Sequence, residues 1–117
     1  MKIRLQRTNE PDLEFEGEEI ARSTSRRDQD QPRWTELVVY KTDTGKWVLN
    51  VLGRSAIPGE TDRSNVAIER YPEDFVERFY SPDNDGGCRL SFPAKVLLRK
   101  LASIFPKIAV FDLKETI

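Results

Sequence analysis

The clearest pattern along the chain lies in residues 33–53, where two runs of β-branched and aromatic residues flank Thr42-Asp43-Thr44-Gly45. Such runs around a short loop that ends in glycine predict a β-hairpin, with a type I turn and Gly45 at a positive φ. If Lys41 pairs with Lys46, then Tyr40 lies opposite Trp47, and the side chains of both runs alternate onto two faces.

Both predicted faces of this hairpin are largely apolar. One face carries Trp34, Glu36, Val38, Tyr40, Trp47, Leu49 and Val51, and the other carries Thr35, Leu37, Val39, Val48, Asn50 and Leu52. An antiparallel hairpin with one solvated face would show one clearly polar side. The hairpin is therefore predicted to lie within a sheet that is covered on both sides, or to keep one face for a partner.

Shorter segments with period-two alternation predict the remaining strands. Ile3 and Leu5 indicate a strand at residues 2–7. Leu13 and Phe15 indicate a second strand, with Gly17 as a bulge that restores the phase of the apolar positions.

Residues 22–33 are polar, show no periodicity and predict a loop. Val66 and Ile68 indicate a further strand at 64–70, which is apolar on one side only and suits a position near the sheet edge.

The apolar spacing becomes helical in the last third of the chain. Residues 72–80 predict a short helix that opens with proline, and residues 91–105 predict a second helix with Ser91 as its N-cap. The tail at 107–117 fits a last strand or a short packed helix, and the strand is favoured. The predicted fold class is α+β, an antiparallel sheet of about five strands followed by two C-terminal helices packed on one face.

Length and composition indicate one globular domain over residues 1–117, with a net charge of −1. The single cysteine, Cys88, allows no internal disulfide and favours a reducing compartment. The chain shows neither the apolar core of a signal peptide at its start nor an apolar run long enough to span a membrane. We therefore expect a cytoplasmic protein with no membrane partner.

The absence of histidine excludes the largest number of chemistries. It removes Ser-His-Asp and Cys-His catalysis, histidine metal sites and a histidine general base. Asp83-Asn84-Asp85-Gly86 lacks the glycine and glutamate that an EF-hand needs at loop positions 6 and 12. Thr44-Gly45-Lys46 lacks the upstream glycine of a P-loop. The sequence thus predicts no catalytic residue, no metal and no cofactor.

The candidate partner-binding residues are aromatic side chains of the hairpin and nearby arginines: Trp34, Tyr40, Trp47, Arg33, Arg26 and Arg27. The three aromatic residues fit core packing, a protein-binding patch or a platform for stacking nucleic-acid bases. The arginines of the 22–33 loop fit either a solvated loop or an arm that contacts phosphates.

Part of the hairpin segment resembles a family of small bacterial proteins, the EXLDI proteins. The likeness rests on Arg33-Trp34-Thr35-Glu36, Val39-Tyr40-Lys41-Thr42, Gly45-Lys46 and Gly53-Arg54-Ser55. The family is named for a C-terminal Glu-x-Leu-Asp-Ile motif, and residues 112–117 differ from that motif. The resemblance implies a bacterial accessory protein and no particular mechanism.

These observations favour a non-enzymatic protein-interaction module, a bacterial or mobile-element accessory or regulatory protein that binds a partner protein, or itself, through the sheet. The alternatives are a protein that binds single-stranded nucleic acid or RNA, and a toxin-type ribonuclease that works without histidine. The nucleic-acid-binding protein would use the three aromatic residues and the arginines of residues 22–33. The ribonuclease would use arginine, lysine, tyrosine and glutamate side chains.

Overall fold

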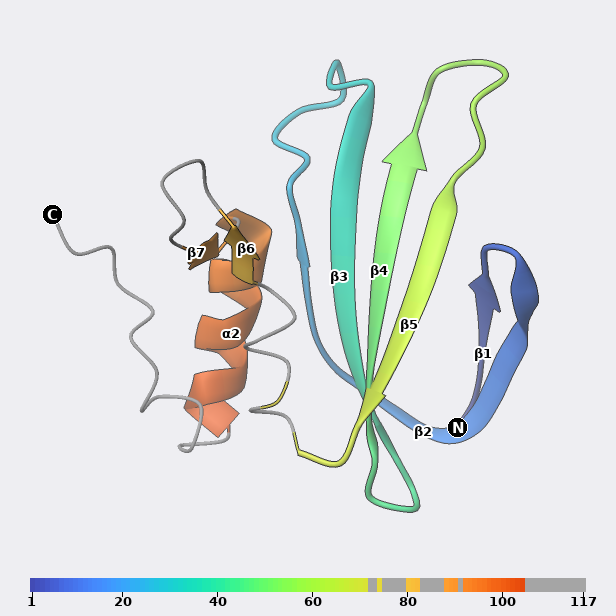
Figure 1. Ribbon diagram of the computed structural model, residues 1–117, viewed down its shortest axis with the longest axis vertical. Coiled ribbons are helices and arrows are strands. Elements are labelled where there is room, and N and C mark those ends of the chain that lie inside the picture. The colour runs from blue at the N-terminus through green and yellow to red at the C-terminus, as the bar shows by residue number, and fades with distance from the viewer. Residues whose placement is uncertain (72–73, 75–79, 83–87, 91, 105–117) are drawn as a thin grey trace, which may run out of the picture.

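Seven strands and one helix make up the described part of the computed structural model, which covers residues 1–71, 74, 80–82, 88–90 and 92–104 (Figure 1). The strands are β1 (Lys2–Arg7), β2 (Glu10–Thr24), β3 (Arg33–Thr42), β4 (Trp47–Ser55), β5 (Arg63–Glu69), β6 (Tyr80–Pro82) and β7 (Cys88–Leu90), and the helix is α2 (Phe92–Ile104). Strands β1 to β5 form one antiparallel sheet in chain order, while β6 and β7 form a separate pair.

The predicted α+β class is wrong, because the described residues form mostly strands and contain only one α-helix, α2. The expected sheet of five antiparallel strands is confirmed, and it curls into a half-barrel. Only one of the two predicted C-terminal helices is present in the described residues, as α2. The helix predicted at 72–80 falls mostly outside the described residues, and Tyr80 at its predicted end belongs to β6. The tail at 107–117 also lies outside them. No described helix is long and apolar enough to cross a membrane.

The curl of the sheet comes from β2, which pairs with two different neighbours along its length. Its first half pairs with β1 up to Glu16, and its second half pairs with β3 from Gly17 onward. The bulge predicted at Gly17 is wrong in position, because Gly17 pairs with Thr42 and the ladder instead skips Ile20, between Glu19 and Ala21. Gly17 itself lies so close to β3 that a Cβ atom would be 2.3 Å from the carbonyl oxygen of Lys41.

Hydrogen bonds from the end of β1 and the turn after it to β5 draw the two ends of the sheet together at one point. Thr8 N–H donates to Ser64 O at 2.9 Å, and Ser64 N–H donates to Thr8 Oγ1 at 2.8 Å. The Ser64 hydroxyl donates to Gln6 O at 2.6 Å and accepts from the buried Asn50 amide at 2.8 Å. The sheet therefore folds back on itself and partly encloses one of its faces.

The central hairpin is present as predicted, with Gly45 at φ 88°, but its pairing differs by one residue. Lys41 pairs with Trp47 and Tyr40 with Val48. The loop has three residues, with Thr42 N–H bonded to Lys46 O (2.9 Å) and Gly45 N–H to Thr42 O (3.0 Å). Since side chains alternate with a period of two, this shift exchanges the two faces of β4 relative to β3.

The corrected register explains why both faces of the hairpin are apolar. The face that we call the outer face packs against α2, in a buried cluster of Ala21, Leu37, Val39, Trp47, Leu49, Leu97, Leu98 and Leu101. The opposite, inner face carries the buried residues Val38, Val48 and Asn50. It is turned toward β1, and the ring of Phe15 on β2 meets that of Tyr40 edge-on at 5.7 Å. One apolar face is thus covered by the helix and the other by the curl of the sheet.

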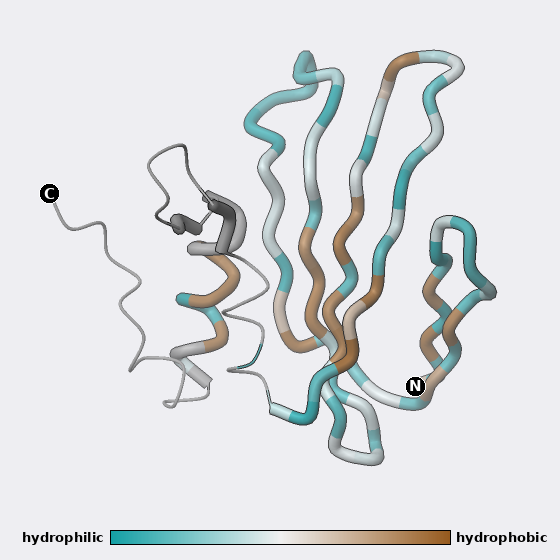
Figure 2. Tube along the Cα trace, in the orientation of Figure 1, coloured by the Kyte–Doolittle hydropathy of each residue, from teal (hydrophilic) through white to brown (hydrophobic). Residues whose placement is uncertain are grey.

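Figure 2 shows that hydrophobic residues are concentrated in the lower half of β3, β4 and β5, the half nearest the 42–46 turn. The loops at the upper end, where β3 begins and β4 ends, are mainly hydrophilic. The upper end is therefore the more polar end of the hairpin.

Candidate functional site

Polar and charged side chains gather at the upper end of the hairpin, where Trp34 lies opposite Arg54 in the ladder. The residues are Arg26, Arg33, Trp34, Glu36, Arg54, Glu60 and Asp62, and we call them the rim site. They come from β3, β4, the loop before β3 and the loop after β4. The loop after β4 is drawn onto the hairpin because the Asp62 carboxylate accepts the Ser55 N–H at 3.0 Å.

A stacked pair, Arg26 on Trp34, is the central feature of the rim site. The guanidinium carbon of Arg26 lies 3.9 Å from the centre of the half-buried Trp34 ring. Arg26 is held there by its own loop, since its Nε donates to Asp28 O (3.2 Å) and its Nη2 to Gln29 O (3.0 Å). Within the described residues, Arg26 forms no ion pair with a carboxylate, and the partners of its guanidinium are the two backbone carbonyls and the Trp34 ring.

A chain of hydrogen bonds fixes Trp34 from the other side, on the inner face. The indole Nε1–H donates to the Glu36 carboxylate at 3.0 Å, and Arg54 Nε donates to the same carboxylate at 3.3 Å. Arg54 also donates to Asp62 at 3.1 Å. The hydrogen bond with Asp62 is the main reason why the pKa of Arg54 is raised. Trp34 is therefore held by Arg26 on one side and by Glu36 on the other.

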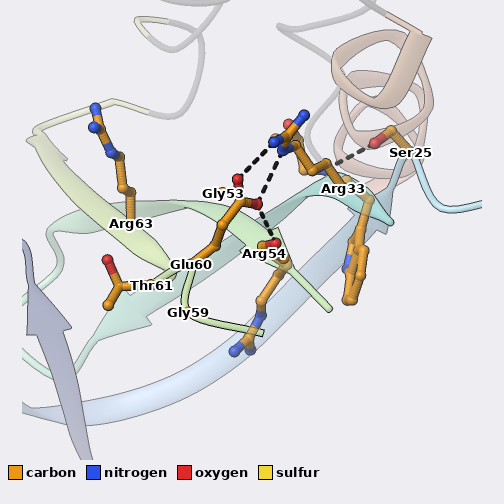
Figure 3. Close-up of a pocket in the computed structure, with 11 residues that line it drawn as sticks. Ser25, Arg33, Gly53, Arg54, Gly59, Glu60, Thr61 and Arg63 are labelled. Atoms are coloured by element: carbon orange, nitrogen blue, oxygen red, sulfur yellow. Dashed lines mark hydrogen bonds and ion pairs between the residues drawn. The ribbon is translucent and has the colours of Figure 1, made fainter. Parts of the chain in front are cut away.

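A second ion pair lies on the outer face of the same strand end. Arg33 Nε donates to the Glu60 carboxylate at 3.0 Å, and the Ser55 hydroxyl donates to it as well. Mainly because of the hydrogen bond with Arg33, the pKa of Glu60 falls to about 2. Figure 3 shows Arg33 and Arg54 extending in opposite directions, while Arg63 points away from the Glu60 carboxylate. These residues border a shallow pocket of about 660 Å³.

A larger cavity, of about 1000 Å³, lies between β1 and the inner face of the sheet. Its apolar floor includes Leu5, Val38 and Leu52, and Tyr40 borders it. Burial is the main cause that raises the pKa of Tyr40. Its arginines are already paired with carboxylates: Arg4 with Asp12, Arg7 with Glu10, Arg22 with Glu19 and Arg54 with Glu36 and Asp62. The cavity therefore offers little unbalanced charge to a ligand.

The structure brings together three of the six predicted partner-binding residues and separates the others. Arg26, Arg33 and Trp34 meet at the rim site. Tyr40 lies farther down the inner face, and Trp47 is only 5% exposed in the core under α2. Arg27 is exposed, and its backbone N–H is bonded to the Gln31 side chain. The predicted grouping of Trp34, Tyr40 and Trp47 on one face is thus wrong.

Sequence reasoning missed Glu36, Arg54, Glu60 and Asp62 as parts of the site. Arg54 was hidden by the one-residue error in the hairpin register, since that register placed Gly53 and not Arg54 opposite Trp34. Glu60 and Asp62 lie on the loop after β4, and no local sequence pattern predicts the path of that loop. Among the described residues, no group of three or more cysteine or carboxylate side chains is placed to hold a metal ion.

Taken together, fold and site define a curled half-barrel that presents an ordered arginine–tryptophan surface at one end. Comparison with protein-family models, curated proteins and solved structures finds no match to this chain.

Proposed function

We propose that the protein is a non-enzymatic interaction module, a small bacterial accessory protein that binds a partner protein at the rim site. The observation that carries this proposal is the Arg26–Trp34 stack. Tryptophan and arginine are the side chains most enriched where single residues dominate the free energy of protein association. Because the pair is already ordered, little conformational entropy is lost when a partner binds.

The charges of the rim site indicate the chemistry of the partner's contact. Arg26 has no carboxylate among its described contacts, whereas Arg33 and Arg54 are paired with Glu60, Glu36 and Asp62. An acidic side chain of a partner protein would meet the guanidinium of Arg26 and the exposed part of Trp34 together. The three carboxylates of the rim site disfavour a nucleic-acid backbone, which would need several unpaired cations in a row. Burial of Trp47 also removes one member of the predicted base-stacking platform.

Affinity capture from lysate of the source cells, quantified by mass spectrometry, tests the proposal with four matched baits. These are the wild type, Arg26→Ala, Trp34→Ala and Lys46→Ala. Lys46 is exposed in the turn at the other end of the hairpin, so its loss matches the charge change of Arg26→Ala without touching the rim site. We expect one set of proteins that the wild type and Lys46→Ala retain and that both rim variants lose.

An Arg26→Lys variant separates stacking from charge alone, because lysine keeps the charge but lacks the planar guanidinium. We expect it to lose most of the captured protein. Equal capture by all four baits would overturn the proposal. If the baits capture nucleic acid and this binding falls steeply as salt is added, the result would support the alternative function, nucleic-acid binding, in place of protein binding. Circular dichroism of each variant verifies that it is folded.

A further inference from the structure

The edge of β5 that faces away from β4 carries backbone N–H and C=O groups that form no hydrogen bond within the described residues. β5 is the last strand of the sheet and pairs with β4 along one edge. Backbone groups of successive residues in a strand point to alternate edges. Asn65 O accepts from the side chain of Asn50 on β4 (3.1 Å), whereas Ser64 bonds Thr8 on the side away from β4. The backbone groups of Val66 and Ile68 therefore point away from β4.

These groups are unpaired within the described part of the chain, since the hydrogen bonds with β1 end at Ser64. The side chain of Ile68 is 47% exposed, and that of Tyr71 is 51% exposed. Between Ser64 and Ile68 there is neither a charged residue nor a proline, the residues that usually protect a sheet edge from other strands. The edge is therefore suited to receive a strand.

We propose that β5 pairs with β5 of a second copy of this chain, antiparallel and about a two-fold axis at Ala67. Since Ser64 is already bonded to Thr8, the open stretch consists of Val66 and Ile68. Only one symmetric register pairs the backbone groups of both residues with each other. In it, Val66 lies opposite Ile68 of the second copy, and Ile68 lies opposite Val66 of the second copy. Each such pair exchanges two backbone hydrogen bonds.

The side chains of this segment complement themselves in that register. The exposed Ile68 packs beside a β-branched valine across the interface, which is a favourable cross-strand pair. Ala67 faces its own copy at the axis, where a small side chain lets the strands approach. Because an isologous contact closes with two copies, it ends at a dimer instead of growing into a fibre. This dimer is independent of the rim site, and Arg26→Ala and Trp34→Ala should leave it intact.

Two measurements on the full chain test the proposal. Light scattering between about 10 µM and about 1 mM, the range where weak dimers are populated, should show the mass rising from monomer to dimer. Over the same range, amide hydrogen exchange should slow at Val66 and Ile68. Exchange at Asn65 and Ala67, whose amides face β4, should stay unchanged and serves as the internal control.

Variants at Ile68 complete the test. Ile68→Lys places two cations near each other across the axis, and Ile68→Pro removes an outward N–H, so each should weaken dimerisation at least tenfold. Ile68→Val is the matched control and should keep it. A monomeric mass at all concentrations would overturn the proposal. Amide exchange that slows no more at Val66 and Ile68 than at Asn65 and Ala67 would overturn it as well. The exchange measurement on the wild type decides the matter even if a variant does not fold.

Discussion

The close approach of β2 to β3 at Gly17 makes a sharp prediction about stability. In a Gly17→Ala variant, the new Cβ would lie 2.3 Å from Lys41 O and 3.0 Å from Thr42 Cα. Both atoms belong to the backbone of β3, so no side-chain rotation relieves the contact. Either β2 or β3 must move, at the point where β2 leaves β1 and joins β3.

Gly53→Ala is the matched control on β4. Its Cβ would meet the Cβ of Arg63 at 3.8 Å and the carbonyl oxygen of Arg63 at 4.0 Å, which are ordinary van der Waals contacts. Both substitutions restrict the unfolded chain in the same way, which stabilises a protein by about 0.4–1 kcal/mol when the native backbone fits. This contribution cancels between the two variants. The difference in their free energies of unfolding is then the overpacking cost, about 1–3 kcal/mol.

Urea unfolding followed by circular dichroism measures this difference. With a slope of about 1–3 kcal/mol per molar urea, typical of small domains, the two midpoints should be separated by roughly 1 M. We expect Gly53→Ala to unfold at or above the wild-type midpoint and Gly17→Ala clearly below it. Equal midpoints would show that β2 does not approach β3 at Gly17, and the curl of the half-barrel would have to be revised.

Two further predictions concern the closure of the sheet and the rim site. Asn50→Ala should lower the free energy of unfolding by about 1–3 kcal/mol, because the buried Asn50 amide donates to Ser64 Oγ and Asn65 O. The variant should also speed amide hydrogen exchange at Thr8. A change in the free energy of unfolding below about 0.5 kcal/mol would contradict the role of Asn50 in closing the sheet. Since the pKa of Glu60 is lowered from its ordinary value of 4.5 to about 2, its contribution to stability is complete above about pH 4.5 and is lost as the pH falls toward 2. An NMR titration of the side-chain carboxyl carbons should give this pKa for Glu60 and a higher one in Arg33→Met, and a wild-type value near 4.5 would refute the ion pair.

The hairpin shows which features a local sequence pattern can predict and which it cannot. Strand propensity and the glycine-closed loop correctly predict both strands and the positive φ of Gly45. The register was wrong because the loop was counted as four residues from Thr42 to Gly45, whereas the turn with its glycine bulge uses three. A three-residue loop of this kind is a common hairpin connection. A three-residue loop from Asp43 to Gly45 places Arg54 opposite Trp34, a pairing that could have been predicted from the sequence alone.

The apolar character of both hairpin faces was correctly noted, but its cause was beyond local reasoning. Two C-terminal helices packed on one face were expected. The described structure uses α2 for the outer face and the curl of β2, with its bulge at Ile20, for the inner face. A bulge shifts the side-chain alternation within a strand, but how far the strand then bends depends on what it packs against.

The sequence by itself determined the five strands of the main sheet, the central turn and the absence of histidine chemistry, because each depends on residues close together in the chain or on composition alone. The tertiary structure decided which aromatic residues lie in the core and which lie at the rim site. Trp34 and Trp47 each follow a basic residue near the start of a strand, yet Trp47 is buried under α2 and Trp34 stacks with Arg26 at the rim. That difference follows from pairings between distant segments, and a change of one residue in register moves a side chain to the opposite face of the sheet.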